Sequence, residues 1–380
     1  MATIRFIHTA DWQLGMTRHY LGEEAQGLFG QARLDAIRRV GRVAAQRKCE
    51  FIVVSGDVFE TNLVNRRTVL RALEALESVP VPVFLLPGNH DPLEAASVYR
   101  SPAFLERKPA QVHVLDSTDP LEVRPGVEVV GVPWTSKRPL SDLVARACAA
   151  LEPAAGTVRV MVAHGAVDTL SPSKLDPALI ALAPAERAIA EGRIQYLALG
   201  DRHSVTQVGS TGRIWFSGTP EPTDFDEVDP GQVLVVEAGT EAASVTRERV
   251  GTWRFIRKDE VHLDRAEDLD ALEQDLAAMQ DKERTILKLG FIGALPIRLK
   301  ARLDTILDHA REVFAAVEQW DRVTELSVRP DDEDFSDLAL AGFAAKAVER
   351  LRRQALGAGP EALEAREALA LLVRLQGRAA

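Results

Sequence analysis

The sequence contains very little cysteine, and its only two, Cys49 and Cys148, lack metal-ligand spacing. A disulfide-stapled fold or a cysteine metal site is therefore not expected, and two buried free thiols suit a reducing compartment. Long apolar runs are also missing, because no stretch approaches the ~18 residues that span a bilayer. The N-terminus shows no secretory signal pattern. We expect a cytoplasmic protein that has no membrane segment.

An excess of positive charge is absent too. The 380 residues include 46 basic and 56 acidic side chains, which give a formal net charge of −10. This balance argues against a protein that coats itself on nucleic acid by bulk attraction. Any contact with nucleic acid must be local, assisted by metal or shared with a partner. The apolar content of 46% is enough for one large folded domain with smaller appendages.

Short apolar runs that end in polar residues recur along the first part of the chain. They are IRFIHTAD, EFIVVSGD, PVFLLPGNHD, VRVMVAHG, IQYLALGDRH and RIWFSGTPEP. Helical patterns such as QARLDAIRRVGRVAAQR lie between several of them, which indicates an α/β architecture. Because ligands gather beyond the carboxyl ends of strands in such sheets, these endings predict one shared cleft.

Several of these endings carry side chains that bind metal ions. The candidates are Asp11, Asp57, Asn89, His90, Asp91, His164, Asp201 and His203. A single aspartate after a strand is more often a turn former or a helix cap, and a single histidine can be an interior side chain. Five such endings in one chain favour a metal centre instead. This interpretation requires Asp57 and His164 to lie close together.

The chemistry of such a centre assigns distinct roles to these residues. Two divalent ions about 3.5–4 Å apart can clamp a phosphate and lower the pKa of a bridging water. Asp57, in the tight SGD turn, is the best candidate for a carboxylate that reaches both ions. Asn89 would add a neutral oxygen. His90 could protonate or stabilise the leaving group, and Asp91 could fix the orientation of the His90 ring.

The order of these motifs resembles the calcineurin-like metallophosphoesterase superfamily, whose fold is a four-layer α/β/β/α sandwich. The strings HTADWQLG, GDVFE, PGNHDP, GVPW and SGTPEP more narrowly resemble the SbcD-type DNA repair exonucleases. Those are nuclease subunits that work with an SMC-like ATPase, SbcC. The resemblance covers residues 1–235 through specific motifs and the remainder only through layout.

The resemblance implies two ligand sets: Asp11, Gln13, Asp57 and His203 for one ion, and Asp57, Asn89, His164 and Asp201 for the other. It makes His90 the phosphate-facing catalytic histidine. Gln13 and Asp201 stand where the family usually has histidine, and Glu60 stands where histidine is often found. Since Gln and Asp coordinate through oxygen, the ligand count is kept and the preference shifts toward Mn²⁺ or Mg²⁺. We expect an active centre with two divalent ions, Mn²⁺ first.

Three regions follow from these patterns: a nuclease domain at residues 1–250, a capping domain at 251–330 and a helical segment at 335–380. The middle region shows a β-α-β-α-β order, in which a helical pattern covers residues 297–319. The last region contains two helical patterns and is too short to form its own core. It must dock on a partner, which the resemblance identifies as the SbcC-type ATPase, or pack on its own chain. A homodimer is also expected.

The leading hypothesis is a metal-dependent DNA nuclease that acts by two-metal phosphodiester hydrolysis as part of an SbcCD-like repair complex. One alternative is a metallophosphoesterase that acts on small nucleotides or phosphomonoesters. It would use the same ligands, so only the cap and the tail discriminate between these two hypotheses. Another alternative is a catalytically weak scaffold that binds DNA ends or the ATPase.

Overall fold

A computed structural model describes residues 3–172, 175–329 and 342–377 of the chain. The described residues form two compact units. The first contains the chain up to Arg18 together with Gln26–Trp253, and the second contains His19–Ala25 and the chain from Arg254 onward. Each unit has its own hydrophobic core.

Two six-stranded sheets form the centre of the first unit. In spatial order the first sheet contains β12 (Ala243–Arg249), β11 (Gln232–Gly239), β1 (Thr3–Thr9), β2 (Phe51–Val54), β3 (Val83–Leu85) and β4 (Val112–Val114). The second contains β5 (Leu121–Arg124), β6 (Val127–Gly131), β7 (Val158–His164), β8 (Tyr196–Gly200), β10 (Ile214–Phe216) and β9 (Thr206–Gln207). Strands β1 to β4 are parallel, as are β6, β7, β8 and β10. The predicted ligands therefore follow the carboxyl ends of parallel strands in both sheets.

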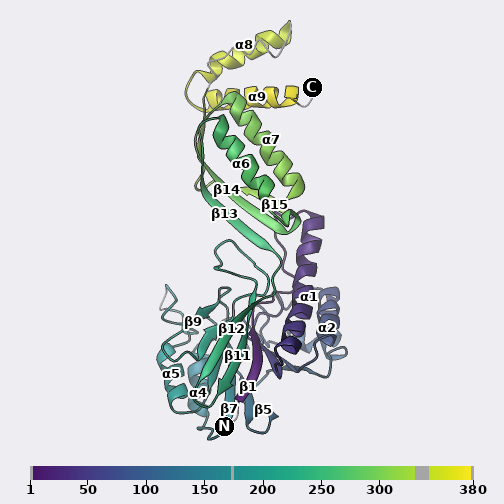
Figure 1. The fold of residues 1–380 in the computed structure, drawn as a ribbon, viewed down its shortest axis with the longest axis vertical. Helices are drawn as coiled ribbons and strands as arrows, with labels where there is room; N and C mark the ends of the chain where they lie inside the picture. Colours follow the sequence, from purple (N-terminus) through teal and green to yellow (C-terminus); the bar gives the residue numbers. More distant parts are fainter. Residues whose placement is uncertain (1–2, 173–174, 330–341, 378–380) are drawn as a thin grey trace. The chain divides into compact units, whose positions relative to one another are not determined.

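Helices cover the outer faces of both sheets. The longer ones are α1 (Glu23–Gln46), α2 (Arg66–Glu77), α4 (Leu143–Ala150) and α5 (Leu182–Ala190), and the short ones are η1 (Val98–Arg100) and α3 (Pro102–Leu105). Figure 1 shows α1 and α2 on one side of this unit and α4 and α5 on the other. The boundary of α2 follows from its cap, because the Asn65 side chain accepts a hydrogen bond from the Thr68 amide at 2.8 Å.

The side chains of the strands point alternately to the two faces of each sheet, and the apolar ones form three layers. On β1, Ile7 packs in the cluster that contains the α1 and α2 side chains, whereas Phe6 packs in the cluster between the sheets. Met161 of β7 packs in a third cluster with residues of α4 and α5. Successive side chains of a strand point to opposite faces, so both faces of each sheet are buried. The predicted four-layer α/β/β/α sandwich is confirmed.

The second unit is a smaller α/β arrangement. Its elements are β13 (Arg254–Leu263), α6 (Ala266–Ala278), η2 (Lys282–Arg284), β14 (Thr285–Pro296), α7 (Ile297–Val313), β15 (Ala316–Gln319) and β16 (Glu325–Arg329). The long strand β14 pairs in parallel with β13 along one edge, and along the other with β15 and then β16. Helix α7 ends at Val313, so the helical pattern predicted up to residue 319 is wrong at its end, where β15 forms instead.

The C-terminal helices form a hairpin of α8 (Phe343–Ala355) and α9 (Pro360–Gly377). Val348 and Leu369 of this hairpin share an apolar cluster with Ile297 and Ala301 of α7 and Val328 of β16. The hairpin therefore packs partly on its own chain. Residues 335–341, with which the predicted helical segment begins, lie outside the described residues. Among the helices that the structure describes, none combines the length and apolar character needed to cross a membrane.

Candidate metal centre

The loops that follow β1 and β2 are held together by backbone hydrogen bonds. The amides of Asp11, Gln13 and Leu14 donate to the carbonyls of Gly56, Asp57 and Val58 at 3.1, 2.9 and 2.9 Å. The pairing of the two strands thus continues past their ends in an irregular form. This arrangement brings the side chains of Asp11, Gln13 and Asp57 to the same edge of the sheet.

The candidate ligands also share an unusual backbone conformation. Asp11, Gln13, Asp57 and Asp201 have φ angles of 54°, 44°, 52° and 100°. Non-glycine residues rarely adopt positive φ, and such strain gathers at functional sites where the surrounding structure enforces it. Close packing adds to the constraint, because a Cβ atom at Gly88 would lie 2.2 Å from Oδ1 of Asp57.

A buried cluster forms where the two sheets meet. Ligand atoms of Asp11, Asp57 and His164 all lie within 4.8 Å of one another. The Nε2 atom of His164 is 3.5 Å from Oδ1 of Asp57 and 3.8 Å from Oδ1 of Asp201. It is also 2.6 Å from Oδ1 of Asn89. The closeness of Asp57 and His164, on which the metal interpretation depends, is therefore observed.

A second group lies around His203. Its Nε2 atom is 3.9 Å from Oδ1 of Asp11 and 3.2 Å from Nε2 of Gln13. The Asp201 amide donates to both carboxylate oxygens of Asp11 at 3.2 Å, which joins this group to the first. The structure thus brings all seven predicted ligands together. Asp57, the predicted bridging carboxylate, lies close to both Asp11 and His164.

Neighbouring groups fix the rings of both candidate histidine ligands. The Nδ1 atom of His164 donates to the Ser55 carbonyl at 2.8 Å, which leaves Nε2 directed at the carboxylates. The Nδ1 atom of His203 lies 2.9 Å from Oε1 of Glu227 and 2.7 Å from the Thr223 hydroxyl. Such contacts orient metal-binding imidazoles and raise their basicity. Sequence reasoning missed Glu227, because nothing distinguishes it from other acids of the segment TDFDEVD.

His90 and Asp91 differ in their surroundings. The Nδ1 atom of His90 donates to the Glu60 carbonyl at 2.9 Å, and Nε2 lies 3.9 Å from Oδ2 of Asp57. The buried Asp91 carboxylate instead accepts hydrogen bonds from the amides of Phe59 and Gly88 and from the Tyr99 hydroxyl. The Glu60 carbonyl, rather than Asp91 as expected, therefore orients the His90 ring. Asp91 holds the loop that carries it.

The donor set fits divalent cations. Gln13 is only 3% exposed, and within the described part of the chain its buried Oε1 atom has no hydrogen-bond partner. Leaving a buried carbonyl oxygen unpaired costs about 1–3 kcal/mol, and coordination to a cation would satisfy it. Carboxylate and amide oxygens outnumber imidazole nitrogens in the set, which suits hard ions such as Mn²⁺ and Mg²⁺.

The pKa values of Asp11 and His164 also favour a bound cation. Burial raises the pKa of the Asp11 carboxyl from 3.8 to about 7, although His203 and His164 oppose this shift. Burial alone would lower the pKa of His164, but the carboxylates of Asp57, Asp11 and Asp201 raise it to about 9. Without a cation, the cluster therefore retains protons that acids and imidazoles normally lose near neutral pH. A bound divalent ion would replace those protons.

A cavity of about 500 Å³ adjoins the centre. Its lining includes the candidate ligands Gln13, Asp201 and His203, and also His90. Glu60 and Arg18 line it as well, and the Arg18 guanidinium donates to the Thr223 carbonyl. A ligand in this cavity would meet the candidate catalytic histidine and the metal-binding side chains together.

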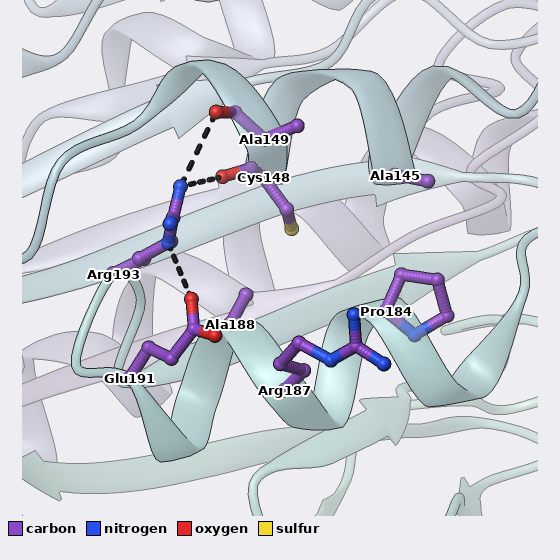
Figure 2. A pocket seen from close by; sticks show the side chains of 8 residues that line it. All are labelled: Ala145, Cys148, Ala149, Pro184, Arg187, Ala188, Glu191 and Arg193. Carbon is purple, nitrogen blue, oxygen red and sulfur yellow. Dashed lines mark hydrogen bonds and ion pairs between the residues drawn. The ribbon is translucent and has the colours of Figure 1, made fainter.

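A smaller cavity of about 260 Å³ lies between α4 and α5. Its lining includes Arg187, Glu191 and Arg193 but none of the candidate ligands (Figure 2). In Figure 2 the Arg193 guanidinium points at the last carbonyls of α4, and Glu191 pairs with it. These contacts satisfy a helix end, so we assign this cavity a structural role.

Comparisons with known proteins find a short similar stretch in one relative and similar solved structures. Over 91 residues, or 23% of its length, the chain is 30% identical to the DNA double-strand break repair protein Mre11 of Archaeoglobus fulgidus. That alignment covers only 19% of the relative. Among solved structures, the chain is similar to TT1561 of Thermus thermophilus, with 10% identity, a TM-score of 0.42 and coverage of 66% of this chain and 100% of that one.

A dimetal phosphatase from Danio rerio is also similar, with 11% identity, a TM-score of 0.37 and coverage of 64% of this chain and 98% of that one. Residues 4–180 match the family model described as Calcineurin-like phosphoesterase, and this segment contains Asp11, Asp57, Asn89, His90 and His164. The chain thus has the fold and a candidate metal site of a metal-dependent hydrolase. The family match covers residues 4–180, somewhat less than half of the chain, and supports a similarity of this segment to the calcineurin-like phosphoesterases.

Proposed function

We propose that the protein is a metal-dependent DNA nuclease that hydrolyses phosphodiester bonds. The observation on which this proposal depends is the convergence of seven oxygen and nitrogen ligands beside a cavity that His90 also lines. The local similarity to Mre11, which is named as a DNA double-strand break repair protein, supports DNA as the substrate. The resemblance of the strand-end motifs to SbcD-type exonucleases supports the same substrate.

In this proposal Asp11, Gln13, Asp57 and His203 would hold one divalent ion, and Asp57, Asn89, His164 and Asp201 the other. When bound, such ions polarise the phosphoryl group and lower the pKa of an attacking water. The chain's own contribution is to hold these ligands rigidly, through the amides that bind their carboxylates and the carbonyls that bind their rings.

His90 has the geometry of a proton donor to the leaving oxygen. Because Nδ1 donates to the Glu60 carbonyl, Nε2 is the atom available to a ligand in the cavity. In the protonated ring, Nε2 carries a proton that it can share with a phosphate oxygen or pass to the departing one. Asp91 acts through the loop that holds His90 in place.

The C-terminal hairpin is the segment that we propose binds an SMC-like ATPase. It leaves large apolar side chains exposed, among them Phe343 at 87%, Leu356 at 72% and Leu363 at 54%. Such a partner would supply basic surface that a chain with a net charge of −10 lacks. We further propose that the nuclease works as a homodimer.

The test is cleavage of linear duplex, hairpin and single-stranded DNA with Mn²⁺, with p-nitrophenyl phosphate as a comparison substrate. We expect DNA cleavage that falls by at least about 100-fold in Asp57→Asn and His90→Ser, consistent with losing a metal ligand or a proton donor. His113→Ser, which removes an imidazole stacked on Phe84 outside the centre, is the matched control.

Two results would contradict the proposal that the protein is a DNA nuclease. Hydrolysis of p-nitrophenyl phosphate without DNA cleavage would favour an esterase that acts on small phosphomonoesters. Binding of two ions with no cleavage, even in the presence of the ATPase partner, would favour a scaffold that binds DNA ends.

A further inference from the structure

The cavity beside the metal centre is lined by more acids than bases. Its charged lining consists of the carboxylates of Glu60, Asp201, Asp224, Asp226 and Glu227 and the guanidinium groups of Arg18 and Arg202. Both guanidinium groups have protein partners, since Arg18 donates to the Thr223 carbonyl and Arg202 to the Thr206 hydroxyl. Among the charged side chains of this lining, carboxylates therefore outnumber guanidinium groups.

Glu60 differs from the other carboxylates of this lining. Glu227 is already bonded to His203, Asp201 belongs to the metal centre, and Asp224 and Asp226 are exposed. The Glu60 side chain is half-buried, and its Oε2 atom is buried without a hydrogen-bond partner among the described residues. Glu60 is thus a carboxylate of the cavity lining whose Oε2 atom receives no hydrogen bond from a cation of the described residues.

The backbone holds Glu60 next to the candidate proton donor. Its amide donates to the Leu14 carbonyl at 3.1 Å, and its carbonyl accepts the hydrogen bond from Nδ1 of His90. Leu14 and Phe59 form an isolated β-bridge directly before this position. Since the main chain is held on both sides, Glu60 stays at the wall of the cavity that His90 also lines.

The charge of a phosphate ester depends on its class. A phosphodiester carries one negative charge at all pH values near neutrality, whereas a phosphomonoester has a second pKa near ~6 and carries almost two. A fixed carboxylate repels the second charge, and this repulsion grows as water is excluded from the cavity. A carboxylate in the lining would therefore disfavour a doubly charged phosphate ester more than a singly charged one.

We propose that Glu60 is a specificity-determining residue that disfavours phosphomonoester dianions and so biases the centre toward phosphodiesters. This inference rests on the proposed function only in so far as the centre hydrolyses phosphate esters. It adds a means by which a nuclease would avoid acting as a general phosphatase, and it does not depend on DNA being the substrate.

The experiment compares Glu60→Gln, which removes the charge and keeps the shape, with the wild type. The substrates are p-nitrophenyl phosphate and bis(p-nitrophenyl) phosphate at pH 8, with Mn²⁺, so that the leaving group is the same. We expect Glu60→Gln to raise kcat/KM for the monoester about tenfold relative to the diester, by removing one unit of repulsion. Added salt should weaken the preference of the wild type for the diester over the monoester, and it should weaken the preference of the variant less.

A binding measurement makes the result independent of turnover. Sulfate and methyl sulfate are unreactive anions with two charges and one, and calorimetric titration into the Mn²⁺-loaded protein gives the affinity for each. Glu60→Gln should raise the affinity for sulfate several-fold more than the affinity for methyl sulfate. Glu122→Gln makes an equal charge change at an exposed site on β5. It should alter neither the monoester-to-diester ratio of kcat/KM nor the sulfate-to-methyl-sulfate ratio of affinities.

The outcomes separate this inference from the proposed function. If DNA cleavage persists while both ratios are unchanged in Glu60→Gln, charge selection by Glu60 is overturned and the nuclease proposal stands. If both ratios shift but no DNA is cut, charge selection is supported and the nuclease proposal fails. Equal gains for monoester and diester would also overturn the inference, because they would indicate a general effect on the centre.

Discussion

Gln13 and Asp201 are the residues at which this centre departs from the histidine ligands of the family it resembles. Both nevertheless lie in the ligand cluster, and both have the positive φ angles shared by Asp11 and Asp57. Backbone strain gathers at functional sites, so the positive φ angles of Gln13 and Asp201 argue that both positions have a function. We therefore interpret the departures as an exchange of nitrogen for oxygen donors rather than as loss of the site.

Replacing Gln13 tests this interpretation. In Gln13→Met the carbonyl oxygen that lacks a partner disappears, so we expect one of two Mn²⁺ ions to bind at least about tenfold more weakly. The metal-free protein should lose little stability, because the lost contact of Nε2 with His203 is offset by the removal of a buried oxygen that has no hydrogen-bond partner. Calorimetric titration and thermal melts measure both effects.

Gln13→His supplies the matched comparison. It should retain two ions and shift the preference from Mn²⁺ toward Zn²⁺, since imidazole nitrogen is a softer donor. Wild-type affinity for both ions in Gln13→Met would refute a ligand role for this residue.

We predict that the hydrogen bond between Glu227 and His203 strengthens metal binding by His203. Burial would lower the pKa of His203, but the hydrogen bond to Glu227 and the charge of Asp11 raise it to about 9. Removing the charge in Glu227→Gln should weaken the ion held by His203 about 10- to 100-fold, as loss of such supporting partners does elsewhere. Thr223→Val removes the uncharged partner of the same nitrogen and should have a smaller effect. Equal losses in the two variants would argue against an electrostatic contribution.

His8 gives a prediction for the pH dependence of stability. It is fully buried between the Tyr196 hydroxyl and the Leu199 carbonyl, and burial lowers its pKa to about 3. Unfolded His8 binds a proton below pH 6.5 that the folded protein does not bind, so its stabilising contribution is lost as pH falls from 6.5 toward 3. The loss is about 1.4 kcal/mol per pH unit.

Urea unfolding of the metal-free protein between about pH 6.5 and 4.5 measures this contribution. His8→Asn should show a shallower dependence of the free energy of unfolding on pH than the wild type. Identical slopes would mean that the buried imidazole does not titrate as stated.

At the level of helices and strands, the sequence predicts what is local in the chain. The ligands follow apolar runs directly, so their strand-end positions and the α/β fold could be predicted. The support from Glu227 and the hydrogen bond from His90 to the Glu60 carbonyl could not, because they depend on how separate loops meet. Strand β15 was missed because its residues, AVEQ, continue the helical pattern of α7, and pairing with β14 decides its conformation.

The end of α4 provides a prediction for one element. Nη1 of Arg193 donates to the carbonyls of Cys148, Ala149 and Leu151 at 3.3, 3.2 and 2.8 Å, as Figure 2 shows for the first two. Arg193→Met leaves these carbonyls without that donor and should lower the free energy of unfolding by about 1–2 kcal/mol. Arg187→Met changes an exposed side chain of the same cavity and should cost less than about 0.5 kcal/mol.

Chemical denaturation distinguishes the two variants, and Mn²⁺ binding should be unaffected in both. A loss of stability in Arg187→Met equal to that in Arg193→Met would contradict the assigned cap.

At the level of the whole molecule, the two compact units have separate cores, and the candidate ligands all lie in the first. We predict two calorimetric unfolding transitions, of which Mn²⁺ raises only one. A ligand at 100 times its Kd stabilises the unit that binds it by about 2.7 kcal/mol. Asp57→Asn should abolish the shift and leave the other transition unchanged. A single transition that moves as a whole with Mn²⁺ would show that the units unfold together.

The assignment of His19–Ala25 to the second unit has a consequence for dissecting the protein. The polypeptide passes from one unit to the other after Arg18, after Ala25 and after Trp253. Cutting the peptide bond after Trp253 would therefore not yield two complete halves, because the N-terminal fragment would retain the segment His19–Ala25, which belongs to the other. Recombinant pieces divided there should regain their native state only when mixed, through reassociation of complementary fragments.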